Sequence, residues 1–160
     1  MRGDLLGLFL IFVMFFSLAG YFFPDWQEAG LRARGEAYKE AVRDCAPLGE
    51  TPARECFWVV GYGDSMYPAI RNGSRICVAK LSTGEKDALG VCDIVLFYPK
   101  DVEFFPPMNY TQGFSWVAHR VVEAGEDENG KFLVVMGDNN DMPGGKLRLE
   151  SDIWLVAAVA

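Results

Sequence analysis

The chain has 160 residues and a formal net charge of −7 at pH 7, from 15 Lys and Arg against 22 Asp and Glu. Its basic residues are scattered, so it lacks the electropositive footprint of a nucleic-acid-binding protein. With any membrane segment set aside, there is room for one globular domain with one hydrophobic core. No C-x-x-C spacing, which would indicate a structural zinc site, occurs among the four cysteines, Cys45, Cys56, Cys77 and Cys92.

The first predicted element is a membrane-spanning helix from Leu5 to Phe23. These nineteen residues carry no charge, and at 1.5 Å per residue they span about 28 Å, close to the hydrocarbon thickness of a bilayer. A cleavable signal peptide is the alternative, but its apolar region would be shorter and would end in a small-x-small site. Tyr21 and Phe22 stand there instead. We therefore expect a retained signal anchor over residues 1–23, with Tyr21 and Trp26 at the membrane interface.

A juxtamembrane helix is predicted next, over residues 24–46. Asp25 is placed as its N-cap, and Glu28 three residues later completes a capping box. Apolar residues then recur at near-helical spacing as far as Cys45, which favours a stalk packed on the domain. A loop rich in Pro and Gly follows. Because Cys45 and Cys56 flank this loop, we expect them to form a disulfide in an external compartment.

The remainder, residues 47–160, is predicted to be a mainly β domain. Short apolar runs bounded by turn residues are typical of strands, and they occur at Arg75 to Lys80, Val91 to Phe97, Trp116 to Glu123, Phe132 to Met136 and Ile153 to Val159. Gly144-Gly145 is expected to interrupt the chain between the last two runs. Pro106-Pro107 argues against a central strand between Pro99 and Ser115. We expect a loop there, either packed in the core or dipping toward the membrane surface.

One stretch, Val59 to Pro68, joins an apolar strand-like run to a glycine-flanked serine. Gly61 and Gly63 permit backbone conformations that are closed to other residues, and Pro68 stiffens the exit. Ser65 in this setting is a candidate nucleophile. The plainer alternative is a Gly-Asp-Ser turn capped by its own side chains.

A nucleophilic serine needs a base, and the chain's single histidine, His119, can fill that role. Its reference pKa of about 6.5 lets an imidazole accept and later release a proton. A carboxylate that orients the imidazole would complete a triad, and the candidates are Asp138 and Asp141. Asp138 adjoins the end of a predicted strand, whereas Asp141 lies in a turn. The alternative for this acidic cluster is a solvated turn capped by its own side chains.

The motifs S-M-x-P at Ser65, H-R-V at His119 and G-D-N-N at Gly137 occur in this order. With them the chain resembles the signal peptidase I family, in the archaeal and endoplasmic-reticulum-type branch, where histidine replaces the bacterial lysine. Cys92 to Phe97 is similar to the family's G-D-I-V-x-F strand with the glycine replaced. The resemblance runs from about Val59 to the C-terminus. It implies a signal-peptidase-like β-sheet or partial-barrel domain behind a transmembrane helix.

The resemblance also implies a serine endopeptidase that removes signal peptides from exported preproteins and needs no cofactor or metal. Ser65 would be the nucleophile and His119 the general base, with Asp141 or Asp138 as the orienting acid. Asp152 lies too far along the chain to be carried over. The family's second aspartate falls near the positions that Gly144 and its neighbour occupy here, so the choice of acid stays open.

A further departure from the family is Gly63, where members often carry a serine whose hydroxyl helps bind the oxyanion. The backbone N–H of Ser65 and a neighbouring amide would have to serve instead, because an oxyanion hole needs aimed dipoles rather than one particular side chain.

The implied partners are signal peptides of preproteins, bound as extended strands, and membrane lipid. The resemblance places small substrate residues in shallow pockets lined by residues before Ser65 and on the Arg75 to Lys80 strand. Accessory subunits stay open, and nucleic acid is excluded by the charge pattern. Basic residues near the span are weak indicators of orientation, so the resemblance decides for a single-pass protein with its catalytic domain on the extracytoplasmic side.

Three alternatives remain. One is a relative that processes a narrow substrate set, such as a pilin or conjugation protein. A self-cleaving repressor-like peptidase shares the G-D-S-M feature, but it uses a lysine base and carries a DNA-binding domain. The third is a catalytically inactive binding module, which Gly63 and the displaced aspartate favour.

Overall fold

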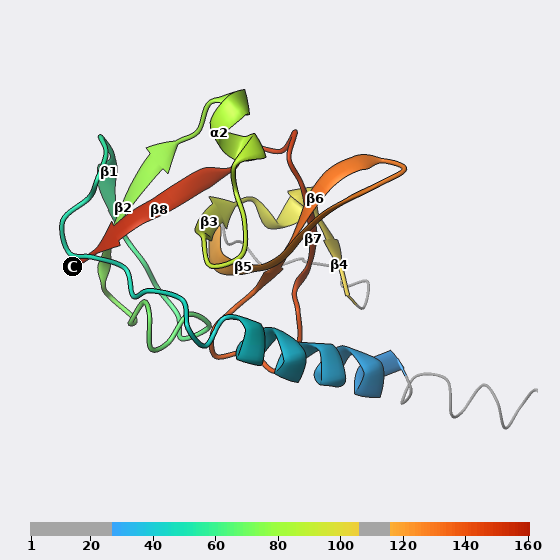
Figure 1. The fold of residues 1–160 in the computed structure, drawn as a ribbon. Coiled ribbons are helices and arrows are strands. Elements are labelled where there is room, and N and C mark those ends of the chain that lie inside the picture. The colour runs from blue at the N-terminus through green and yellow to red at the C-terminus, as the bar shows by residue number, and fades with distance from the viewer. Residues whose placement is uncertain (1–26, 106–115) are drawn as a thin grey trace, which may run out of the picture.

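An antiparallel sheet of eight strands forms the body of the part of the chain that the structure describes (Figure 1). The computed structural model describes residues 27–105 and 116–160. The strands are β1 (Phe57–Val60), β2 (Arg75–Lys80), β3 (Ile94–Phe97), β4 (Val102–Phe104), β5 (Val117–Asp127), β6 (Gly130–Met136), β7 (Gly145–Arg148) and β8 (Trp154–Val159). They lie in the order β1-β2-β8-β3-β5-β6-β7-β4. The prediction of a mainly β domain is confirmed.

Helices are few in the described part. A long N-terminal helix over residues 27–41 runs along one side of the sheet in Figure 1. A short helix, α2 (Thr83–Asp87), and a single 3-10 turn, η1 (Pro99–Asp101), connect strands. No helix within residues 27–105 and 116–160 is long and apolar enough to cross a bilayer, and the predicted span Leu5 to Phe23 lies outside the described residues.

Burial on both faces explains why β6 is apolar along most of its length. Successive side chains of a strand point to opposite faces of the sheet. Leu133 and Val135 enter the largest core cluster on one face. Phe132, Val134 and Met136 point to the other face, where the N-terminal helix covers them.

The N-terminal helix is fastened to the sheet by contacts on one of its faces. Tyr38 and Val42 pack on the apolar residues of β6, and the Tyr38 hydroxyl donates to the Glu123 carboxylate. Gly35 is buried, and a side chain there would overlap the backbone of Asp141. The predicted helix is therefore present and packed on the domain, although it ends at residue 41 rather than near Cys45.

Two disulfides link segments that are far apart in sequence. Cys45 pairs with Cys92, with their Cα atoms 5.4 Å apart, and Cys56 pairs with Cys77, at 5.6 Å. The expected Cys45–Cys56 pair is wrong. The reason is the pairing of β1 with β2, which brings Cys56 beside Cys77, while the N-terminal helix carries Cys45 to the turn before β3. The tertiary fold therefore decides which cysteines pair, and the short loop between Cys45 and Cys56 does not.

Two short strands were not anticipated from the sequence. β7 begins at Gly145, where a break was expected, and β4 lies in the stretch expected to be a loop. They pair with each other, and a side chain on Gly145 would overlap the carbonyl oxygen of Glu103. Glycine there permits the close approach of the two strands. The rest of the expected loop, 106–115, lies outside the described residues.

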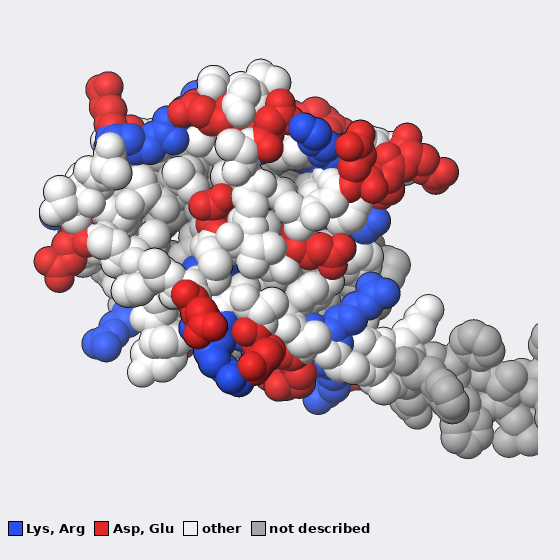
Figure 2. Space-filling model, in the orientation of Figure 1, with Lys and Arg blue, Asp and Glu red and all other residues white. Residues whose placement is uncertain are grey.

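Acidic and basic side chains are interspersed over the face of the molecule shown in Figure 2. That face carries no basic patch. The pattern agrees with the charge distribution along the sequence.

Candidate active site

Ser65 lies in a turn between β1 and β2 that is anchored at both ends. On the β1 side, the Gly61 N–H donates to the Ser74 carbonyl at 2.9 Å. Gly63 has a φ of +97°, a conformation that glycine adopts without steric cost. On the other side, Met66 and Ile70 are buried in the core. The turn therefore presents Ser65 at a fixed place on the molecule.

The G-D-N-N turn packs against the backbone of the turn that holds Ser65. The Asn139 N–H donates to the Ser65 carbonyl at 2.8 Å. A Cβ on Gly137 would lie 2.6 Å from the same carbonyl oxygen, a distance that real side chains do not tolerate. Two of the sequence motifs thus meet through their backbones, and glycine is required at their junction.

His119 lies on β5, and its ring lines the same cavity as Ser65. This cavity has a volume of about 650 Å³, and its walls are mostly apolar and aromatic. Besides Ser65 and His119, polar side chains from Tyr62, Asp64 and Asn140 line it. Ser65 and His119 make no hydrogen bond to each other. Catalytic hydrogen bonds often tighten only when substrate binds.

His119 is held in its neutral form. Burial lowers the pKa of its imidazole to about 4, and the negative charge of Asp138 offsets this only in part. The residue as a whole is half-buried, but its Nδ1 is sealed from solvent and finds no hydrogen-bond partner among the described residues. Because Nδ1 is the shielded nitrogen, Nε2 is the one available to the cavity.

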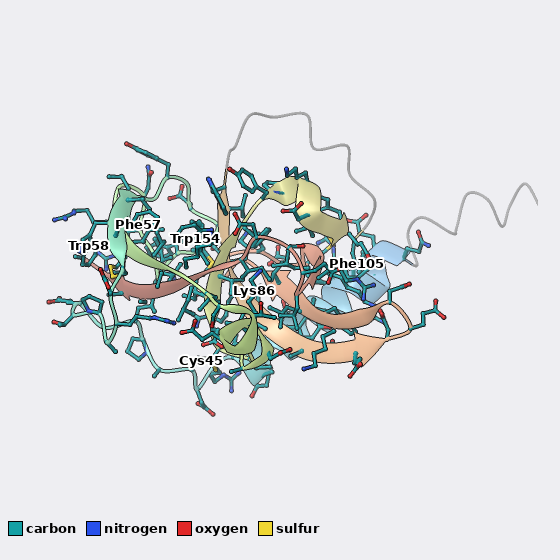
Figure 3. All side chains as sticks on the ribbon, turned by 90° about the horizontal axis from the view of Figure 1, so that it is seen from above. Cys45, Phe57, Trp58, Lys86, Phe105 and Trp154 are labelled. Carbon is teal, nitrogen blue, oxygen red and sulfur yellow. A yellow bond between two sulfur atoms is a disulfide. The ribbon has the colours of Figure 1, made fainter. Side chains whose placement is uncertain are left out.

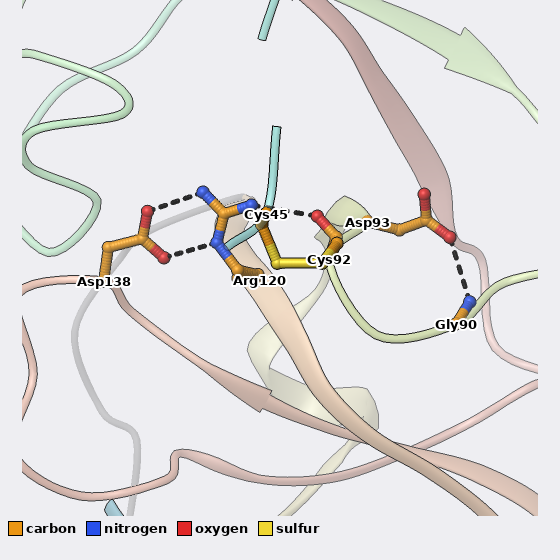
Figure 4. Close-up of a disulfide and its surroundings, with 6 residues drawn as sticks. All are labelled: Cys45, Gly90, Cys92, Asp93, Arg120 and Asp138. Carbon is orange, nitrogen blue, oxygen red and sulfur yellow. Dashed lines mark hydrogen bonds and ion pairs between the residues drawn. A yellow bond between two sulfur atoms is a disulfide. The ribbon is translucent and has the colours of Figure 1, made fainter. Parts of the chain in front are cut away.

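Asp138 is occupied by an arginine. Arg120 donates to both carboxylate oxygens, each at 2.8 Å, and donates a third hydrogen bond to the Cys92 carbonyl at 2.9 Å (Figure 4). The side chains of Arg120 and Asp138 are only 8% and 14% exposed. Through these hydrogen bonds Arg120 of β5 connects the G-D-N-N turn to Cys92, which forms a disulfide with Cys45. Asp138 acts on His119 through space and makes no hydrogen bond to it.

Asp141 lies on the outer surface, toward the N-terminal helix. Its carboxylate accepts from the Lys39 ammonium at 2.8 Å, and its side chain is 72% exposed. This contact lowers the pKa of Asp141. Asp152 is exposed and does not line the cavity. The structure therefore brings Ser65 and His119 to one cavity and places no aspartate of the three in hydrogen-bonding contact with the imidazole.

Gly144 is the residue that lies against the shielded ring nitrogen. A Cβ on Gly144 would stand 3.5 Å from His119 Nδ1. From the sequence, Gly144 was expected to interrupt the chain near the place of the family's second aspartate, and no role was predicted for Arg120. A basic residue followed by the apolar pair Val121-Val122 was the available signal for a buried ion pair, because such residues are rarely buried without a partner.

The backbone N–H of Ser65 is open to a ligand. No residue in the part of the chain that the structure describes accepts a hydrogen bond from it. It can therefore serve as one donor to a developing oxyanion. Across the same described residues, no three His, Cys, Asp or Glu side chains gather as a metal site would require.

Comparison with known proteins finds no likeness. No protein-family model, curated protein or solved structure matches the chain.

Proposed function

We propose that this chain is a membrane-anchored serine endopeptidase of the signal peptidase I type, which removes signal peptides from exported preproteins. The observation that carries the proposal is the shared cavity of Ser65 and His119, residues that lie far apart in the sequence. A turn capped by its own side chains, the plainer interpretation of Ser65, accounts neither for this cavity nor for the support that the G-D-N-N turn gives.

The chemistry follows from the states of the two side chains. A neutral His119 takes the proton from the Ser65 hydroxyl through Nε2 as the oxygen attacks the scissile carbonyl carbon. The carbonyl oxygen becomes an oxyanion, which accepts a hydrogen bond from the Ser65 N–H. The C–N bond then breaks, and the imidazolium returns its proton to the leaving amine. Water, deprotonated by His119, hydrolyses the resulting ester and restores Ser65.

An extended substrate can bind at the edge of the sheet. Among the described strands, β1 pairs only with β2, so its other edge carries backbone groups that no described strand pairs with. Phe57 of β1 lines the cavity and is 51% exposed, and its ring meets Trp154 edge-on at 5.2 Å (Figure 3). Ile76 is the residue of β2 that reaches the cavity. These features support apolar recognition of a peptide laid along β1.

The proposed setting is a single-pass membrane protein with the catalytic domain on the extracytoplasmic side. The uncharged run Leu5 to Phe23 would anchor the chain, and the helix over 27–41 would join the anchor to a signal-peptidase-like partial barrel. Both disulfides support an oxidising compartment, because such bonds persist outside the cytosol.

A catalytically inactive binding module is the second candidate. The observation in its favour is His119 Nδ1, which has no partner among the described residues, so no carboxylate there accepts a hydrogen bond from the imidazolium. Such a module would hold the same extended peptide without cutting it.

Cleavage of a model preprotein by the full chain in liposomes tests the proposal, with product masses giving the cut site. Wild type is expected to cut after a small residue, and Ser65→Ala to lose at least about 10³-fold in rate with its melting temperature unchanged. Ser151→Ala is the matched control, because Ser151 contributes a backbone carbonyl to Lys86 and lies outside the cavity. Peptide binding without cleavage by wild type would favour the inactive module.

A further inference from the structure

A buried ring nitrogen without a partner is unusual in a folded protein. Most buried polar side-chain atoms have a hydrogen-bond partner, and an unsatisfied one destabilises the fold by about 1 to 3 kcal/mol. His119 Nδ1 has no such partner among residues 27–105 and 116–160, and it lies beside the cavity that holds Ser65.

The wall next to this nitrogen is the backbone of Gly144. Its N–H donates to the Val135 carbonyl at 2.8 Å, and its carbonyl accepts from the Phe105 N–H at 3.2 Å. Its φ lies outside the left-handed region, so a side chain meets no backbone penalty there. A Cβ would stand 3.5 Å from His119 Nδ1 and 3.3 Å from the Val135 carbonyl oxygen, which leaves it tight but tolerable.

The two aspartates of the G-D-N-N turn and its end are already occupied, and the other acidic side chain at the cavity, Asp64, is exposed to solvent, whereas His119 Nδ1 is sealed from it. Asp138 gives both oxygens to Arg120, and Asp141 gives one to Lys39 at the surface. The remaining neighbours on facing strands are apolar, with Val95 paired opposite His119 on β3 and the Phe97 ring 6.0 Å away. Position 144 is therefore where a group can reach Nδ1 directly.

We propose that position 144 sets the strength of the base in this site: with glycine there, Ser65 and His119 work as a dyad, and a carboxylate at 144 would convert them into a triad. This inference rests on the proposed peptidase function. Glycine has no side chain that could bond to Nδ1. A carboxylate at this position would accept a hydrogen bond from the Nδ1–H and stabilise the imidazolium that forms when Ser65 loses its proton.

Gly144→Asp in the full chain tests the proposal, with two independent readouts. His119 is the single histidine, so its imidazole titration is followed by NMR in detergent micelles without assignment ambiguity. The midpoint is expected to rise from about 4 in wild type to above the ordinary value of about 6.5. The neutral control Gly144→Asn should keep a low midpoint, and Gly144→Ala measures what the Cβ alone does to the melting temperature.

The second readout is the rate of preprotein cleavage at pH 7. Gly144→Asp is expected to cut at least about 10-fold faster than both wild type and Gly144→Asn, a fraction of the effect of a triad aspartate elsewhere. An unchanged midpoint in a folded Gly144→Asp protein overturns the proposal, and so does a raised midpoint with an unchanged rate. A raised midpoint with no cleavage by any form overturns the peptidase function while supporting the placement of position 144 beside Nδ1.

Discussion

Asp138→Asn separates a structural aspartate from a catalytic one. In the structure Asp138 neutralises Arg120, whose side chain is 8% exposed, through two hydrogen bonds of 2.8 Å. Replacing the carboxylate by an amide leaves a buried guanidinium without its counter-ion. Removing one partner of a buried pair destabilises a protein by about 3 to 5 kcal/mol.

The expected loss is near the lower end of that range, because Asp138 keeps 14% of its side-chain surface in solvent. At about 4 °C per kcal/mol for a domain of this size, a loss of about 3 kcal/mol lowers the melting temperature by about 12 °C. Thermal unfolding followed by circular dichroism in detergent measures it. Asp141→Asn is the control, because exposed ion pairs such as Lys39–Asp141 contribute less than about 1 kcal/mol.

A double variant tests the cause. Arg120→Met with Asp138→Leu removes both charges and is expected to be more stable than Asp138→Asn alone, since apolar replacements of a buried pair are often neutral. If Asp138→Asn melts within about 2 °C of wild type while cleavage falls about 10⁴-fold, the reasoning is refuted and Asp138 is the imidazole partner.

Three further predictions follow from single contacts. Burial lowers the pKa of His119 to about 4, so between pH 6.5 and pH 4 the unfolded chain binds a proton at His119 that the folded chain does not bind. The free energy of unfolding is therefore highest above pH 6.5 and falls toward pH 4 by at most about 3 kcal/mol. Urea unfolding at both pH values should show a smaller loss for His119→Gln. Gly35→Ala should destabilise the fold by about 1 to 3 kcal/mol, because the added methyl group would overlap the Asp141 backbone. Gly30→Ala in the same helix meets no atom and should stabilise the fold by up to about 1 kcal/mol. Equal shifts in melting temperature for the two variants would contradict the packing of the helix on the sheet. Cys92 has a φ of +87°, a conformation that glycine adopts more easily than alanine. Cys92→Gly should therefore be more stable than Cys92→Ala by about 1 kcal/mol, although both variants lose the disulfide. The opposite order of stability in chemical unfolding would reject that backbone conformation.

The long apolar runs predicted the strands well because their patterns are local. β2 spans Arg75 to Lys80 as predicted, and β6 extends the predicted run by only two residues. β4 and β7 could not be found in this way, because their sequences, Val-Glu-Phe and Gly-Lys-Leu-Arg, contain no apolar run. Their pairing depends on a close approach at Gly145 that is set by tertiary structure.

For the candidate site, the sequence singled out individual residues but not the contacts between them. Motif spacing identified Ser65 and His119, which the structure places at one cavity. The partner of each aspartate depends on residues remote in sequence: Arg120 on β5 for Asp138, and Lys39 on the N-terminal helix for Asp141. No local pattern records which cation a carboxylate will meet, and for the same reason the disulfide pairing was wrong.

The most direct test of the account is whether Ser65 is a nucleophile activated by His119. The full chain is incubated with a peptidyl phosphonate ending in alanine, and the modified residue is found by peptide mass mapping. We expect a single adduct, on the Ser65 oxygen, that forms at least about 10²-fold more slowly in His119→Ala. No adduct on Ser65, or one that forms equally fast without His119, would contradict it.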